Sequence, residues 1–507
     1  MPSNVFQTLA DAAEASPDRV AVRMGDQTVT YADLLSRVDA AACALQEAGV
    51  TAGDRVALMM GNRVSFVVGL YAAWRTGAVV VPVNPSLTAP EVAHELSDSR
   101  ARVIVIGRAY VDVIAALRGT QPDLEHVFVA DSTQAVDPDS GTQSWHGTLE
   151  AHGGRRPEAV GVGEETLALL AYTSGTTGVP KGAMLTHGQL LANHHQLAAS
   201  SMGVQPDDIV FNALPLYHIY ALNVALALTL AAGATLELVE RFDPSGNLDL
   251  IVQRRATVIV GAPPMYVAWL NTPGADQADL SHVRLATSGA AGLPAKILLR
   301  CADELGLDVR EGYGLTEAAP VVASTAALPQ TVPGCVGQPL QGIELRVIDD
   351  GDLAHEGDPG VIHIRGANVF SGYWEQPDAT AEVLSDDGWL DTGDIGYVAD
   401  GLLYLVDRAK DIIIVSGFNV YPVEVEAALV AHPAVMQAAV VGVLHPYTGE
   451  AVKAFVVLDP DSDLTADELI NHSATMLARF KQPAAVEFVS DLPMLPTGKL
   501  KRRELRT

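Results

Sequence analysis

A segment rich in glycine, hydroxyl groups and lysine, residues 170–182, has the clearest chemistry in the sequence. It reads Leu-Ala-Tyr-Thr-Ser-Gly-Thr-Thr-Gly-Val-Pro-Lys-Gly and follows an apolar, strand-like run. Backbone N–H groups beside glycine, hydroxyl groups and a lysine ammonium can together hold a polyphosphate. A Walker A loop is excluded, because that pattern ends in Gly-Lys-Ser/Thr. The candidate phosphate-binding residues are Thr173, Ser174, Gly175, Thr176, Thr177, Gly178 and Lys181.

A second candidate is Glu317, which ends the sequence Tyr-Gly-Leu-Thr-Glu. The glycine permits a close approach of the backbone to a ligand. A single carboxylate beside a phosphate-binding loop suits Mg²⁺, which takes one or two carboxylates together with phosphate oxygens. The residues alone leave an alternative, in which Glu317 begins a helix after an N-cap at Thr316.

Composition limits the compartment and the partners of this chain of 507 residues. Its formal net charge of −29 argues against nucleic acid or an anionic membrane as the main partner. Cys43, Cys301 and Cys335 have no metal-binding or disulfide-framework spacing. The first residues contain no basic region followed by an apolar one, as a signal peptide would. We therefore expect a cytoplasmic protein.

The stretch from Asn212 to Leu236 contains no Asp, Glu, Lys or Arg and is long enough to span a bilayer. It also contains Pro215, His218 and Gly233, and it ends in a strand-like alternation. These features favour a buried helix flanked by strands over a transmembrane segment.

Short β-branched runs alternate with helical patterns, which predicts an α/β fold with largely parallel sheets. From about residue 332 to 406 the pattern changes to short strands separated by Asp-Gly and Asp-Pro turns, which indicates a β-rich subdomain. Residues 411–507 indicate a separate α+β domain. The expected strands are Arg102–Ile106, Leu167–Tyr172, Ile209–Leu214, Thr235–Val239, Thr257–Val260, Val283–Thr287 and Ile412–Val415.

Further segments stand in a fixed order with the glycine-rich one: Leu214–His218, Thr287–Ala290, Glu311–Glu317, Trp389–Asp394, Asp407–Lys410 and Pro496–Lys499. Together they closely resemble the adenylate-forming superfamily of acyl-CoA synthetases, aryl-CoA ligases, beetle luciferases and peptide-synthetase adenylation domains. The resemblance covers nearly the whole chain, and within the superfamily bacterial fatty acyl-CoA synthetases are most similar. It implies an N-terminal domain over 1–406 with two αβ sheets and a distorted β-barrel, a hinge over 407–410, and a mobile C-terminal lid over 411–507.

The resemblance implies the following roles at the nucleotide site. Gly289, Ala290, Gly312, Tyr313, Gly314 and Thr316 would surround the adenine, with Tyr313 as a stacking face. Asp394 would accept hydrogen bonds from the ribose hydroxyls, and Arg408 would reach the same sugar. Thr173 belongs to the catalytic set, and Glu317 would bind Mg²⁺ beside the phosphates of ATP.

Two lysines and one short segment carry the roles implied for the lid. Lys499 would stand between the substrate carboxylate and the α-phosphate, where an ammonium offsets the charge that develops on phosphorus. Lys410 would be the hinge. After adenylate formation the lid would rotate, withdraw Lys499 and present Ser416, Gly417 and Phe418 to coenzyme A.

The implied activity is a ligase that forms an acyl-adenylate and pyrophosphate from a carboxylic acid and ATP, then a thioester with release of AMP. His218 would border the carboxylate end of the acyl pocket, which Tyr220, Gly289 and Gly314 would also line. The aliphatic run Val224–Leu230 and a 6% aromatic content favour a medium- or long-chain fatty acid.

Three alternative functions stay open. One is an aryl acid, because His218–Leu222 also resembles 4-coumarate ligases, in which the tyrosine meets a phenolic hydroxyl. Others are a carrier protein as the acyl acceptor, and a non-catalytic nucleotide- or acyl-binding relative. The chain is either a monomer or a homodimer.

Overall fold

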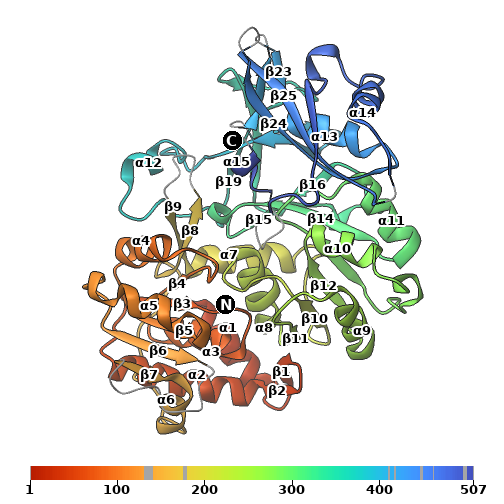
Figure 1. Cartoon of the computed structure of the whole chain (residues 1–507). Coiled ribbons are helices and arrows are strands. Elements are labelled where there is room, and N and C mark those ends of the chain that lie inside the picture. The colour runs from red at the N-terminus through yellow and green to blue at the C-terminus, as the bar shows by residue number, and fades with distance from the viewer. Residues whose placement is uncertain are drawn as a thin grey trace.

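The protein is described by a computed structural model over residues 2–130, 141–174, 180–408, 411–415, 418–445, 449–460, 462–494 and 500–505. The order of its elements is α/β throughout the first 314 residues, as the sequence predicts. Figure 1 shows the C-terminal part, in blue, at the top of the view above two larger sheets. The α/β fold with a large N-terminal and a smaller C-terminal part is thereby confirmed.

The first sheet has seven strands in the order β7-β6-β5-β3-β4-β8-β9. All neighbours are parallel except β8 and β9, which form an antiparallel hairpin across the glycine-rich segment. The strands are β3 (Arg55–Met59), β4 (Val79–Pro82), β5 (Ala101–Gly107), β6 (His126–Ala130), β7 (Thr142–Ser144), β8 (Leu167–Ser174) and β9 (Pro180–Thr186). Its helices are α1 (Val5–Ala15), α2 (Tyr31–Glu47), α3 (Val64–Arg75), α4 (Ala89–Ser99), α5 (Val111–Leu117), α6 (Trp145–Ala151) and α7 (His187–Ala198).

The second sheet has a parallel half, built by strands that run β14-β13-β12-β10-β11-β1, with β2 antiparallel at the edge. The strands are β1 (Val20–Met24), β2 (Gln27–Thr30), β10 (Ile209–Asn212), β11 (Thr235–Leu238), β12 (Val258–Gly261), β13 (Leu285–Ser288) and β14 (Val309–Gly314). The helices between them are α8 (Leu228–Ala231), α9 (Pro244–Arg254), α10 (Pro263–Leu270) and α11 (Ala295–Leu305). The expected strands within residues 102–287 are all confirmed.

The β-rich subdomain is confirmed as a run of antiparallel strands, but it continues the second sheet. The order β18-β17-β19-β20-β21-β16-β15 joins the parallel half where β14 pairs with β15. The strands are β15 (Val321–Ser324), β16 (Cys335–Pro339), β17 (Glu344–Asp349), β18 (Asp352–Leu353), β19 (Gly360–Arg365), β20 (Leu390–Ala399) and β21 (Leu402–Arg408), with the short helix α12 (Pro377–Ala381).

The uncharged stretch folds as a buried helix between β10 and β11, as expected, but its first part is a π-helix, Tyr220–Ala227, that continues into α8. The hydrogen bond from Leu228 N–H to the carbonyl of Asn223 spans five residues, as is typical of a π-helix. Within the part of the chain that the structure describes, no helix has the length and apolar character needed to cross a membrane.

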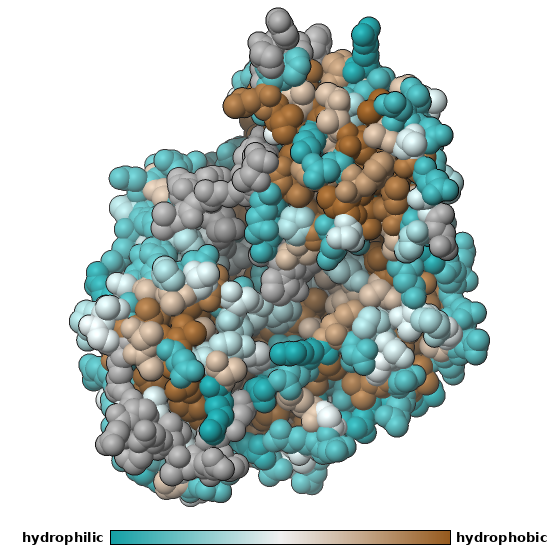
Figure 2. All heavy atoms as spheres, in the orientation of Figure 1, coloured by the Kyte–Doolittle hydropathy of each residue, from teal (hydrophilic) through white to brown (hydrophobic). Residues whose placement is uncertain are grey.

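The C-terminal part has its own five-stranded sheet, with the order β23-β22-β25-β24 and β26 beside β25. Its buried side chains form two small clusters of their own, separate from those of the two larger sheets. Figure 2 shows apolar side chains gathered on its surface. Leu444, Ile414 and Met476 are exposed large apolar residues of this part. The elements are β22 (Ile413–Val415), β23 (Phe418–Val420), α13 (Pro422–Val430), β24 (Val435–His445), β25 (Gly449–Leu458), α14 (Ala466–Ser473), β26 (Ala485–Phe488) and α15 (Arg502–Leu505).

Candidate active site

The predicted site residues of the second sheet lie where its parallel strands end. Leu214–His218 follows β10, Thr287–Ala290 ends and follows β13, and Gly312–Gly314 ends β14. Because the carboxyl ends of parallel strands meet at one edge of a sheet, these segments come together there. The register confirms the proximity of the last two, since Ser288 pairs with Glu311 across β13 and β14.

Glu317 lies in a short 3₁₀ turn, Thr316–Ala318, that follows β14. Its Oε1 accepts a hydrogen bond of 2.9 Å from the hydroxyl of Tyr373. The Nζ of Lys181 lies over the ring of Tyr373, 5.1 Å from its centroid. The structure therefore brings Lys181 of the first sheet and Glu317 of the second to the same tyrosine, as a shared phosphate and metal site requires.

Tyr373 lies at the candidate site beside Glu317 and Lys181, and the sequence analysis did not predict it. It lies beside β9, because Ser371 N–H donates to the carbonyl of Met184 at 3.0 Å and Trp374 N–H donates to that of Gly182 at 2.8 Å. Burial and the nearby charge of Glu317 raise the pKa of Tyr373, so the phenol keeps its proton and donates it to the carboxylate. The local sequence signal that could have pointed to Tyr373 is the pair of turn residues before it, Ser371-Gly372.

Tyr313 and Asp394 form the second contact between predicted residues. The hydroxyl of Tyr313 donates to Oδ2 of Asp394 at 2.7 Å, and both side chains are buried. Asp394 lies on β20 and is the register partner of Arg408 on β21. The residues proposed for adenine and for ribose thus meet directly, although they are 81 positions apart.

At two glycines of this edge an added side chain would crowd its neighbours. A Cβ on Gly314 would lie 2.2 Å from the carbonyl oxygen of Pro320, and a Cβ on Gly289 would lie 3.0 Å from the ring of Tyr220. Ala290 has a φ of 69°, in the left-handed region that an L-residue adopts at a cost. The segment after β13 therefore turns sharply, with its backbone close to Tyr220.

Tyr220 begins the π-helix, and its hydroxyl lies 2.9 Å from Oγ1 of Thr287. That Oγ1 also lies 3.3 Å from the carbonyl oxygen of Ile259, to which it can only donate. The Thr287 hydroxyl therefore accepts its hydrogen bond from Tyr220. Burial raises the pKa of Tyr220 to about 12, so the phenol remains protonated. His218 precedes the π-helix, and its carbonyl accepts from Leu222 N–H at 2.8 Å.

Several predicted residues lie outside the part of the chain that the structure describes: Gly175, Thr176, Thr177, Gly178, Lys410, Ser416, Gly417 and Lys499. For three others only the position of the backbone is described: Ser174 ends β8, Arg408 ends β21 and Phe418 begins β23. Thr173 is described on β8, opposite Lys181 on β9.

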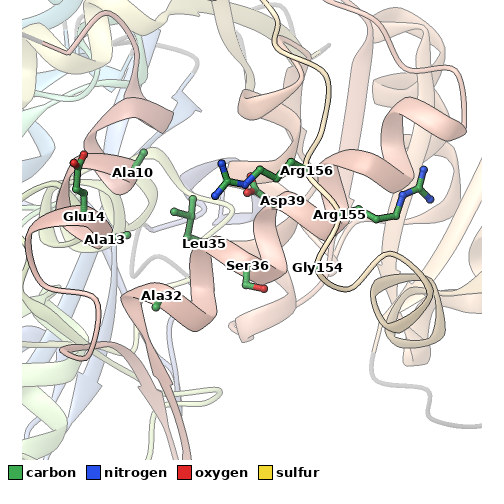
Figure 3. Close-up of a pocket in the computed structure, with 10 residues that line it drawn as sticks. All are labelled: Ala10, Ala13, Glu14, Ala32, Leu35, Ser36, Asp39, Gly154, Arg155 and Arg156. Atoms are coloured by element: carbon green, nitrogen blue, oxygen red, sulfur yellow. The ribbon is translucent and has the colours of Figure 1, made fainter.

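A surface groove elsewhere contains none of the predicted site residues. It lies between α1, α2 and the segment 154–156, and Figure 3 shows its lining. Burial raises the pKa of Asp39 in this groove, while the charges of Arg75 and Arg156 act in the opposite direction. The ends of the parallel strands, where several predicted residues meet, remain the candidate active site.

Comparison with known proteins identifies the family. A family model described as AMP-binding enzyme matches residues 9–374, and one described as AMP-binding enzyme C-terminal domain matches residues 424–499. The chain belongs to the AMP-binding enzyme family. It is an AMP-forming acid–CoA ligase, as the sequence predicts.

Relatives of this family member differ in the acid that they are named for. A feruloyl-CoA synthase of Amycolatopsis sp is 39% identical over 97% of this chain and 96% of its own length. A long-chain-fatty-acid–CoA ligase of Escherichia coli O157:H7 is 37% identical over 99% and 94%. The corresponding ligase of Bacillus subtilis is 34% identical over 100% and 94%.

Solved structures of the family have the same fold over the whole chain. ATP-bound MatB from Rhodopseudomonas palustris superposes with a TM-score of 0.92 at 34% identity, covering 100% of this chain and 98% of its own. The anthranilate CoA ligase AuaEII, in complex with anthranoyl-AMP, gives 0.92 at 28% identity, covering 100% and 97%.

Proposed function

We propose that this AMP-forming ligase activates a medium- or long-chain fatty acid and transfers the acyl group to coenzyme A. The observation that favours an aliphatic acyl group is the hydrogen bond that the Tyr220 hydroxyl donates to Thr287. A buried hydroxyl that already donates to a protein partner needs no polar group from the substrate. An apolar acyl chain can then lie against Tyr220 without leaving that donor unpaired.

The aliphatic run after Tyr220 does not itself support this proposal. Val224–Leu230 is buried, and its side chains pack in the main hydrophobic core. Packing in the core therefore explains this run. Support for a fatty acid comes instead from the hydrogen bond between Tyr220 and Thr287 and from the fatty-acid ligases among the relatives.

We assign the phosphates of ATP to Thr173 and Lys181 with the intervening residues, and Mg²⁺ to Glu317. Among the described residues no group of three His, Cys, Asp or Glu could hold a metal by itself. A lone carboxylate fits Mg²⁺ that takes its remaining ligands from phosphate oxygens and water. Bound there, Mg²⁺ would neutralise charge on the pyrophosphate leaving group. Tyr373 would orient the carboxylate through its hydrogen bond.

A hydroxycinnamate is the second candidate substrate. The Tyr220 oxygen donates its own proton to Thr287, so it can still accept a hydrogen bond from a substrate phenol. The feruloyl-CoA synthase among the relatives gives independent support to this candidate.

A substrate panel tests the proposal. The enzyme is supplied with ATP, Mg²⁺, coenzyme A and one acid at a time: octanoate, palmitate, ferulate, benzoate or malonate. Pyrophosphate release reports adenylate formation, and mass spectrometry reports the thioester. We expect the fatty acids to give the highest kcat/KM. Thioester formation on a carrier protein but not on coenzyme A would change the acceptor, and no pyrophosphate with any acid would favour a binding protein.

Tyr220→Phe separates the two substrate classes. For a fatty acid, loss of the hydroxyl should change kcat/KM by no more than about twofold, because no hydrogen bond to the substrate is lost. For a hydroxycinnamate, kcat/KM should fall by about tenfold, the effect of losing one hydrogen bond of roughly 1.4 kcal/mol. Cinnamate, which lacks the phenol, is the control substrate. A selective loss with ferulate and 4-coumarate, in an enzyme whose wild-type kcat/KM is higher for these acids than for the fatty acids, would overturn the fatty-acid assignment.

A further inference from the structure

The β8–β9 hairpin has two faces with different surroundings. Thr173 pairs with Lys181, and Tyr172 pairs with Gly182. Since successive side chains of a strand point to opposite faces, Thr173 and Lys181 share one face and Tyr172 lies on the other. Lys181 reaches the ring of Tyr373 beside Glu317, so its face is turned to the candidate active site.

The opposite face of the hairpin is held by helix α4. The hydroxyl of Tyr172 donates to Oδ2 of Asp98 at 2.6 Å. Nε2 of His94 lies 3.2 Å from the carbonyl oxygen of Pro180. A carbonyl only accepts, so this ring nitrogen carries the proton. One helix thus bonds to the last residues of β8 and to the first residue of β9.

Further observations support the contact between α4 and the hairpin. A capping box of Thr88 and Glu91 closes its first turn, and Val92 and Leu96 are buried in the core beneath it. Burial, with the charge of Asp98 adding, raises the pKa of Tyr172, so its phenol stays a donor. Gly182 makes room for the tyrosine ring, which would lie 3.3 Å from a Cβ at that position.

We propose that His94 and Asp98 are positioning residues for the ATP phosphates. By fixing both strands of the hairpin from behind, they set the place of Thr173 and Lys181 on its other face. The inference rests on the proposed function, in which that face binds the β- and γ-phosphates. Neither residue reaches the substrate itself, so both act through the backbone of the hairpin and through Tyr172.

His94→Ala tests the inference, with His94→Gln as the conservative variant. Alanine removes the donor to Pro180, whereas the amide nitrogen of glutamine can take the place of Nε2. We expect His94→Ala to raise the KM for ATP by roughly two- to tenfold, the range for one lost hydrogen bond. His94→Gln should restore most of that loss. The exposed His146, which pairs with Glu150, gives the matched control His146→Ala.

The two half-reactions separate positioning from general damage. Thioester formation from synthetic acyl-AMP and coenzyme A involves no β- or γ-phosphate, so it should stay within about twofold of wild type in His94→Ala. Tyr172→Phe breaks the contact with Asp98 and should raise the KM for ATP in the same range, which keeps the test usable if one variant folds poorly.

Two results would overturn the inference: an unchanged KM for ATP in both His94→Ala and Tyr172→Phe, or an equal loss in both half-reactions. Failure of the proposed function looks different, because the wild-type enzyme would then release no pyrophosphate with any acid.

Discussion

Glu311 is a buried carboxyl at the edge of the candidate site. Its Oε1 accepts from the backbone N–H of Leu293 at 2.9 Å, which ties the segment after β13 to β14. Its Oε2 and the hydroxyl of its register partner Ser288 are both buried without a hydrogen-bond partner in the described structure. Burial raises the pKa of Glu311 to about 7, while the bond from Leu293 opposes the shift. Below pH 7 the carboxyl is therefore mostly protonated in the native protein.

Replacement of Glu311 by glutamine should make the protein more stable in alkaline solution. The pKa is raised from 4.5 in the unfolded reference to about 7 in the native state, so the native state binds the extra proton. Its contribution to stability is full below the unfolded pKa and is lost as the pH rises through 7. We expect Glu311→Gln to exceed wild type by up to about 3 kcal/mol near pH 8.5 and by little near pH 5.

Urea unfolding of both proteins at the two pH values measures this difference. Glu95, whose pKa burial raises to about 8, acts in the same direction in both proteins and cancels from the comparison. The exposed Glu382 gives the control Glu382→Gln. A difference between Glu311→Gln and wild type that does not change with pH would contradict the prediction.

The 3₁₀ turn that carries Glu317 is too short to fix its own position, and buried amides from other elements hold the backbone that follows it. Nδ2 of Asn368 donates to the carbonyl of Ala318 at 2.6 Å, and that of Asn223 to Ala319 at 2.7 Å. Asn193 bonds to both backbone groups of Val321. All three asparagines are fully buried. The metal-binding carboxylate proposed here thus depends on tertiary contacts.

Asn368→Ala should weaken this support measurably. It leaves the carbonyl of Ala318 and the amide of Gln196 without their partner. Buried polar groups left unpaired cost about 1–3 kcal/mol, so the free energy of unfolding should fall by about 2 kcal/mol. Urea denaturation measures it, with the exposed Asn271→Ala as a control expected within about 0.5 kcal/mol of wild type. A loss no larger than that of the control would show that the amide is not needed.

The same network explains which features of the site could be predicted. Strands such as β5 and β12 carry β-branched runs, and Glu317, Lys181 and Asp394 stand in recognisable motifs. Asn368 lies 50 positions from the carbonyl that it binds, and Tyr373 lies 56 from Glu317, so no local pattern links them. The π-helix could not be predicted from the sequence either, because its apolar composition is the same as that of a buried α-helix.

At the scale of the whole molecule, the C-terminal part packs around its own core and makes few described polar contacts with the rest. Lys296 of α11 reaches the carbonyl of Pro433 at 3.4 Å. Hydrogen bonds from Thr88 lower the pKa of Glu91 on α4, and the charge of Lys501 adds a smaller effect in the same direction. A unit with its own core and a sparse polar interface can move as a rigid body. That is what a lid serving two half-reactions requires.

Lys499→Ala tests the lid at this scale. Met494 pairs with Leu500 as an isolated bridge, so the two ends of the Lys499 segment lie together, on the same domain as α15. If the ammonium offsets charge on the α-phosphate, its loss should slow pyrophosphate release by about 100-fold or more, as for other preorganised charge partners. Thioester formation from synthetic acyl-AMP has no such step and should change little. The control Lys453→Ala removes a lid lysine that pairs with Glu487. Equal losses in the two half-reactions would mean that Lys499 supports the lid as a whole. They would contradict the proposal that the lid takes one position for adenylate formation and another for thioester formation.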